Sequence, residues 1–193
     1  MVILSRHLHR CGFTVFNFGY PSREGSIDEH VEALRAFIDA AAPSGEPLSF
    51  VGHSLGGIIV RAFALRYQSE LTLHRLVMLG PPNQGSELAR ILKTRVPVVK
   101  RLMGASFVEV GALNLAPASD ILHIGIIAGT ALRSHPLFSG VNDGIVSVGE
   151  TELEGAADAA AVWGLHSFLM FQPRVLRLAA AFLERGRFET DEA

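Results

Sequence analysis

Ser54 lies in the stretch Gly52-His53-Ser54-Leu55-Gly56, between the apolar run 48–51 and a longer apolar run, 55–68. The first run predicts a strand and the second a buried helix. A G-x-S-x-G turn between a strand and a helix holds its serine in a strained backbone conformation and exposes Oγ at the carboxyl end of the sheet. This stretch therefore predicts a nucleophilic serine; the alternative is a glycine-rich turn with an incidental serine.

The neighbours of Ser54 have predicted roles of their own. We expect Gly52 and Gly56 to lie where any side chain would collide with the adjoining strand and helix. The amide of Leu55, near the start of the helix, is expected to point toward the space above Ser54, where it can stabilise an oxyanion. We expect His53 to pack against the turn and hold it, and not to transfer protons.

A serine nucleophile needs a general base, and four histidines follow it in the chain: His74, His123, His135 and His166. His166 is the expected base, because it follows the last apolar run and precedes the final helix, so it should lie at the carboxyl end of the last strand. His135, in a loop before Pro136, is the alternative. His74 precedes a predicted strand and His123 begins or lies within one, so neither is expected at that end.

The base in turn needs a carboxylate to orient it, and Asp143 is the expected residue. It lies in Asn142-Asp143-Gly144, in the long connection after the predicted strand 122–128. Asp158 and Glu150 are rivals, and a plain turn, with aspartate chosen for turn chemistry, is the alternative for Asp143 itself.

The elements that must position these residues alternate between short apolar runs and longer amphipathic ones. This alternation favours an α/β fold with a mostly parallel central sheet and helices on both faces. We expect helices over 2–10, 27–41, 55–68 and 173–185, and strands over 13–20, 48–51, 75–79, 122–128 and 160–163. Ser26 and Glu29 predict a capping box before the second helix. We expect one domain, 1–193, with a possible cap or lid insertion at 85–117.

Composition excludes several classes of protein. Hydrophobic residues make up 49% of the 193 residues, which argues against disorder, and the net charge of -2 gives no electrostatic footprint for nucleic acid. The single cysteine permits no intrachain disulfide, and no Cys/His cluster has zinc spacing, so we expect no metal or cofactor. No apolar run is long enough for a transmembrane segment and no secretion signal is recognisable, so we expect a cytoplasmic protein. The oligomeric state is left open.

Several stretches together resemble the lipase and esterase branch of the α/β-hydrolase superfamily: GHSLGG (52–57), GPPNQGS (80–86), IAGT (127–130), NDGIVSV (142–148) and LHS (165–167). The resemblance implies a Ser54, Asp143, His166 triad that hydrolyses a small-molecule or lipid carboxylic ester. Such hydrolases begin with a strand and a His-Gly loop that supplies a second oxyanion amide, and this sequence contains no His-Gly dipeptide. We therefore expect a core that is N-terminally truncated, with Met1 as a candidate internal methionine.

Two other functions are compatible with the same residues. One is a non-catalytic binding module on a hydrolase scaffold, which the missing His-Gly loop favours and the three triad candidates oppose. The other is an acyltransferase or thioesterase on the same fold, because a fold does not fix a function.

Overall fold

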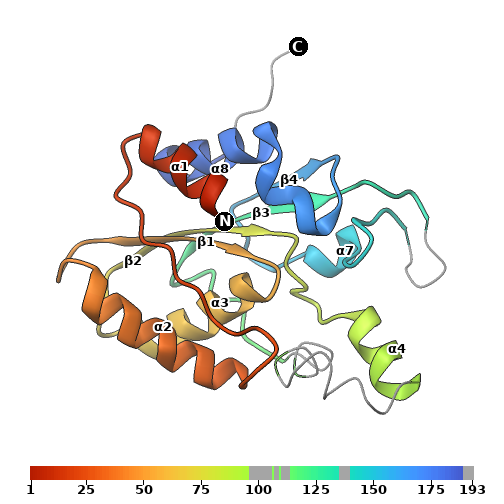
Figure 1. The fold of residues 1–193 in the computed structure, drawn as a ribbon, viewed down its shortest axis with the longest axis horizontal. Helices are drawn as coiled ribbons and strands as arrows, with labels where there is room; N and C mark the ends of the chain where they lie inside the picture. The colour runs from red at the N-terminus through yellow and green to blue at the C-terminus, as the bar shows by residue number, and fades with distance from the viewer. Residues whose placement is uncertain (96–105, 107–108, 110–113, 135–139, 189–193) are drawn as a thin grey trace.

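The computed structural model describes residues 1–95, 106, 109, 114–134 and 140–188. Its sheet has four parallel strands in chain order: β1 (Leu48–His53), β2 (Leu73–Leu79), β3 (His123–Gly129) and β4 (Asp158–Val162). Helices cover both faces, with α1 (Val2–Arg10) and α8 (Pro173–Arg185) on one face and α2 (Ile27–Ala41) and α3 (Leu55–Tyr67) on the other (Figure 1). The predicted fold class, a parallel α/β sheet with helices on both faces, is confirmed.

The two faces of the sheet bury two separate hydrophobic cores. Val77 and Leu79 pack with α1 and α8, whereas Leu76 and Met78 pack with α2 and α3. Successive residues of β2 therefore point to opposite faces, as the period of a strand requires. Burial on both faces explains why the central strands β2 and β3 carry no polar residue in their carboxyl-terminal halves.

The ends of the helices follow the local signals in the sequence. Ser26 accepts a hydrogen bond from the Glu29 amide and Glu29 bonds back to the Ser26 amide, so the predicted capping box is confirmed. Pro173 occupies the first turn of α8, where its missing N–H costs nothing. The remaining described helices are α4 (Glu87–Arg95), α7 (Val148–Thr151) and the short 3-10 helix η1 (His166–Phe171).

The strand predicted over 13–20 is wrong. The segment runs from α1 on one face of the sheet to the start of α2 on the other, and it forms no ladder with the described strands (Figure 1). Alternating aromatic and polar residues give a chain the character of a strand, but a strand also needs a neighbouring edge with which to pair. β1 is hydrogen-bonded to β2 alone in the described sheet.

The predicted cap falls mainly on residues that the structure does not describe. α4 lies inside the range 85–117, while residues 96–105, 107–108 and 110–113 lie outside the described chain, as does His135. The cap therefore stays a prediction. Among the helices that the structure describes, none combines the length and apolar character needed to cross a bilayer.

Candidate active site

Ser54 lies at the turn between β1 and α3 in a backbone conformation that L-residues seldom adopt, with φ 52° and ψ -124°. Its amide donates to the carbonyl of Leu79, the last residue of β2, over 2.8 Å. Strain of this kind persists only where the surrounding structure enforces it, and it is concentrated at functional sites. The turn therefore has the backbone form expected of a nucleophile elbow.

The glycines around Ser54 differ in what they permit. A Cβ at Gly52 would lie 2.5 Å from the backbone nitrogen of Gly57, and a Cβ at Gly57 would lie 2.7 Å from Cε of Met78. At Gly56 the nearest atom would be the Tyr20 hydroxyl at 3.7 Å, an ordinary contact. The prediction that a side chain would collide is thus confirmed for Gly52 and wrong for Gly56. Gly57 is the glycine of the helix at which a side chain would collide.

Asp143 and His166, 23 residues apart in the sequence, are joined by a buried hydrogen bond of 2.7 Å between Oδ2 and Nδ1. A carboxylate accepts, so Nδ1 carries the hydrogen and Nε2 is left as the basic nitrogen. The other carboxylate oxygen accepts from the amides of Ile145 (3.0 Å) and Val146 (2.7 Å). The His166 amide also donates to the Asp143 carbonyl over 3.0 Å, so backbone and side chains both fix the pair.

Two glycines at strand ends make room beneath this pair. A Cβ at Gly80, directly after β2, would lie 3.1 Å from both Oδ2 of Asp143 and Nδ1 of His166. A Cβ at Gly129, the last residue of β3, would lie 2.6 Å from Cβ of Asp143. No role of its own is predicted for either glycine from the sequence, although each directly follows a predicted strand and such a position could have identified it.

His53 contacts the base from the nucleophile side. Its Nε2 donates to the His166 carbonyl over 3.0 Å, and the centroids of the two imidazole rings lie 4.7 Å apart. Burial, and then the neighbouring His166, lower the pKa of His53 to about 4. His53 is therefore neutral at pH 7, and the nitrogen that faces the carbonyl carries its hydrogen.

The three predicted catalytic residues thus gather at the carboxyl edge of the sheet. Ser54 is bonded to the strand end that precedes Gly80, and its neighbour His53 is bonded to His166. Within the described chain, Ser54 Oγ forms no hydrogen bond with His166. Catalytic hydrogen bonds are often long in unliganded enzymes and tighten when substrate binds.

The family model of the "Thioesterase domain" matches residues 3–105, just over half of the chain. The chain belongs to the thioesterase domain family. No curated protein sequence matches it significantly.

Solved structures of hydrolases share the fold of this thioesterase-family chain. The mature Bacillus licheniformis lipase BlEst2 has TM-score 0.55 and 18% identity, over 75% of this chain and 69% of that one. The metagenomic carboxyl esterase MGS0156 has TM-score 0.63 and 15% identity, with 86% and 58% covered. The RedJ thioesterase of Streptomyces coelicolor prodiginine biosynthesis has TM-score 0.58 and 14% identity, with 96% and 81% covered.

The rival acids of the thioesterase-family chain are engaged elsewhere. Asp158 begins β4, at its amino end, and accepts from the Phe188 amide over 2.7 Å. Glu150 forms a capping box with Ser147 at the start of α7 and accepts from the Glu87 amide over 2.6 Å. Neither carboxylate is hydrogen-bonded to a histidine in the described chain.

The two other described histidines that follow Ser54 in the chain lie at the amino ends of strands. His74 is the second residue of β2, and His123 is the first residue of β3, where its Nε2 lies 2.7 Å from the Gly186 carbonyl. Both are at the opposite edge of the sheet from Asp143. In the described residues no group of three or more His, Cys, Asp or Glu side chains is arranged to hold a metal ion.

Proposed function

We propose that the chain is a serine hydrolase that cleaves carboxylic esters of small molecules or lipids, with Ser54 as nucleophile, His166 as general base and Asp143 as its orienting acid. The buried Asp143–His166 hydrogen bond of 2.7 Å, at the edge of the sheet where Ser54 occupies a strained turn, carries the proposal. An aspartate on Nδ1 fixes the tautomer in which Nε2 can accept a proton.

The proposed reaction has two halves. Nε2 of His166 takes the proton of Ser54 as Oγ attacks the ester carbonyl, and it returns that proton to the departing alcohol when the C–O bond breaks. A water molecule then attacks the acyl-enzyme with His166 again as base, which releases the acid and restores Ser54. Asp143 stays ionised throughout and stabilises the imidazolium.

The developing negative charge on the carbonyl oxygen needs a donor that is already in place. Leu55 is the first residue of α3, so its amide has no intrahelical partner, and the partial positive charge of a helix N-terminus lies at the same point. We propose the Leu55 amide as an oxyanion donor. Residues 85–117, as the proposed cap, would contact the acyl chain.

A thioester is the second candidate substrate, and the match to the thioesterase family model favours it. The same triad chemistry applies, with a thiolate as the leaving group in place of an alkoxide. Comparing nitrophenyl esters with acyl-coenzyme A thioesters on one enzyme preparation would rank the two. Transfer of the acyl group to an added alcohol in preference to water would instead indicate an acyltransferase.

A fluorophosphonate probe tests the proposal most directly, because it reacts with an activated serine. We expect labelling of the wild-type chain, none of Ser54→Ala, and undiminished labelling of Ser49→Ala, whose serine is exposed on β1, the strand before Ser54. Ester hydrolysis should disappear with the labelling. If well-folded wild-type protein were not labelled, the proposed serine hydrolase function would be contradicted and a non-catalytic binding module favoured.

A further inference from the structure

Four large apolar side chains are exposed within nine residues around His166. They are Trp163 (70% exposed), Leu165 (45%), Phe168 (57%) and Phe171 (45%), and we refer to them as the aromatic patch. The rings of Phe168 and Phe171 lie 6.3 Å apart on η1. Clustered apolar exposure of this kind marks an interaction surface, whereas single exposed residues need no explanation.

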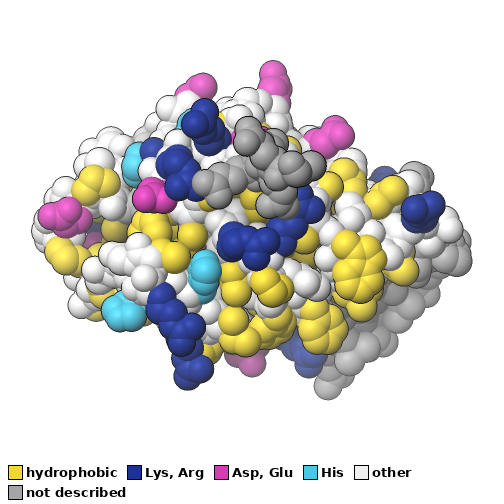
Figure 2. All heavy atoms as spheres, turned by 90° about the horizontal axis from the view of Figure 1, so that it is seen from above, with side chains coloured by type: hydrophobic (Ala, Val, Ile, Leu, Met, Phe, Trp, Pro, Cys, Tyr) yellow, Lys and Arg dark blue, Asp and Glu magenta, His cyan; other side chains and the backbone are white. Residues whose placement is uncertain are grey.

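The elements beside the aromatic patch are basic. η1 contacts both α1 and α8, and these two helices carry five arginines and one glutamate. Arg6, Arg10 and Arg177 are exposed among them. Figure 2, which looks onto this face from above, shows hydrophobic side chains over much of it, with Lys and Arg side chains among them and some Asp and Glu side chains.

The helices of the opposite face are closer to balanced in charge. There α2 carries four acidic residues and one arginine, and α3 carries Arg61 and Arg66 with no acidic residue. The larger excess of arginine among these four helices is thus on α1 and α8, the face that also exposes the aromatic patch. That excess would orient this face toward an anionic surface.

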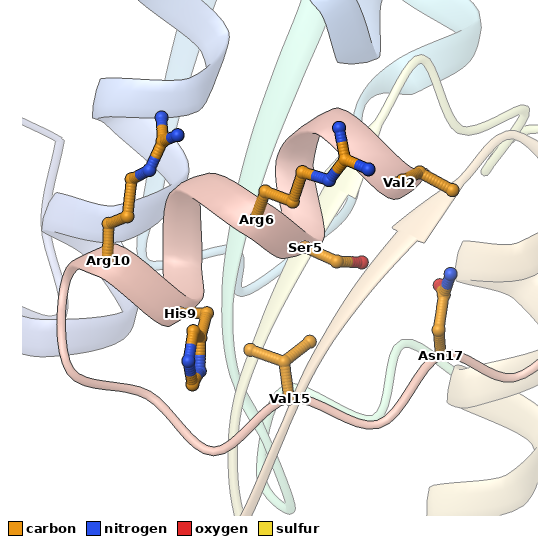
Figure 3. A pocket seen from close by; sticks show the side chains of 7 residues that line it. All are labelled: Val2, Ser5, Arg6, His9, Arg10, Val15 and Asn17. Carbon is orange, nitrogen blue, oxygen red and sulfur yellow. The ribbon is translucent and has the colours of Figure 1, made fainter.

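An open cavity of about 320 Å³ lies on the same side of the molecule, between α1 and residues 13–17. Its polar lining is Ser5, Arg6, His9, Arg10 and Asn17 (Figure 3). Two guanidinium groups with a hydroxyl, an imidazole and an amide are donors of the kind that a phosphate group accepts from.

We propose that this face docks on an anionic lipid surface, with the aromatic patch inserted at the level of the headgroups and the arginines of α1 and α8 against lipid phosphates. Apolar burial and attraction to anionic lipid both contribute to interfacial binding of this type. Docking in this orientation would bring the loop that carries His166 against the lipid surface.

Trp163 is the only tryptophan of the chain, so its fluorescence reports directly on the aromatic patch. We expect its emission to move to shorter wavelength when the full chain is titrated with phosphatidylglycerol vesicles, and to be quenched by brominated acyl chains. Phosphatidylcholine vesicles should produce a much weaker response. The Ser54→Ala protein should respond like the wild type, so binding is measured independently of hydrolysis.

Variants separate the two contributions to binding. Phe168→Ser should weaken partitioning into phosphatidylglycerol vesicles about tenfold, whereas Phe16→Ser, a matched exposed phenylalanine outside the aromatic patch, should leave it unchanged. Arg177→Glu changes the charge by two units and should weaken it about 25-fold at low salt, at about fivefold for each unit of charge. Arg23→Glu, an exposed arginine in the turn before α2, is the control.

Three results would overturn the proposal. One is emission that neither vesicle type changes. Another is an equal response to both lipids that Arg177→Glu does not reduce. The third is a shift that depends on protein concentration without lipid, with a matching increase in mass by light scattering, which would assign the aromatic patch to a second copy of the chain. Circular dichroism of each variant ensures that a lost response is not a lost fold.

Discussion

The carboxylate of Asp143 is only 1% exposed, and its two oxygens are held by different parts of the chain. One accepts from His166 and the other from two successive amides of its own turn. Burial of an ionised carboxylate is costly unless each oxygen has a donor, and here each does. The turn therefore does more than reverse the chain, because it fixes the direction from which Asp143 meets the imidazole.

Asp143→Asn tests this role. An amide in place of the carboxylate can donate to Nδ1 and favour the wrong tautomer, so we expect kcat for ester hydrolysis to fall by about 10⁴-fold. Asp158→Asn, at the amino end of β4, should leave kcat within about twofold of the wild-type value because it lies at the other edge of the sheet. Equal losses in the two variants would contradict the assignment.

His53 should make folding stability depend on pH. Its pKa is about 4 in the folded chain and near its ordinary value of 6.5 when unfolded. As the pH falls from 6.5 to 4, the unfolded chain takes up a proton that the folded chain refuses, so stability falls by roughly 3 kcal/mol over this window. Below pH 4 both states are protonated and the contribution no longer changes.

The variant His53→Gln removes this titration but keeps an N–H that can donate to the His166 carbonyl. We expect the free energy of unfolding, measured in urea at several pH values, to vary less between pH 4 and 6.5 in this variant than in the wild type. The free energies of unfolding of the two proteins should converge as the pH falls. If the free energy of unfolding varied with pH in the same way in both proteins, His53 would not be the buried neutral group.

At this scale the sequence predicted residue types and their order better than their contacts. Ser54, Asp143 and His166 could be selected because each follows a predicted strand. The bond between His53 and His166 spans 113 residues and leaves no local signal. The G-x-S-x-G motif includes Gly56 and not Gly57, yet one residue along a helix turns the side-chain direction by about 100°, which is enough to exchange the packed position for the open one.

Among the elements, the helices were predicted well because their bounds depend on local sequence signals. The helices at Val2–Arg10 and Pro173–Arg185 have the predicted bounds, because an amphipathic face and a terminal signal are local properties. The segment 13–20 has the composition of a strand but no hydrogen-bonded neighbour in the described sheet. Strand pairing depends on a second stretch of chain, and no pattern within one stretch supplies it.

The packing of β1 against α3 provides a prediction for these elements. Gly52→Ala would place a methyl group 2.5 Å from the backbone nitrogen of Gly57, and backbone cannot give way as a side chain can. We expect a loss of about 3 kcal/mol in the free energy of unfolding. Gly56→Ala, with only the Tyr20 hydroxyl at 3.7 Å, should stay within about 1 kcal/mol of the wild type in the same urea titration. Similar values for both would contradict the close approach at Gly52.

At the scale of the whole molecule, Arg61 joins parts of the chain that are far apart in sequence. It is 1% exposed on α3, and its guanidinium donates to Asn83 after β2 and to the carbonyls of Leu115, Ala116 and Pro117. Asn83 in turn donates to the carbonyl of Thr151 on α7. The helix that follows the nucleophile, the chain before β3 and the helix after Asp143 are thus connected through one cation.

Burial lowers the pKa of Arg61 to about 10, so it remains charged at pH 7, and within the described chain its hydrogen-bond partners are carbonyl groups and not carboxylates. Arg61→Met would keep the apolar stem and leave several buried acceptors without a donor. We expect the free energy of unfolding to fall by about 3 kcal/mol or more, because each unsatisfied buried group costs about 1–3 kcal/mol.

Arg66→Met is the matched control on the same helix. Arg66 is bonded to Asp28 and Glu32 of α2, but its side chain is 40% exposed, so water can replace those partners. Its loss should cost no more than about 1 kcal/mol. Urea unfolding of both variants measures the difference directly. A cost for Arg61→Met as small as that for Arg66→Met would mean that the separate parts of the molecule hold their places without the buried cation.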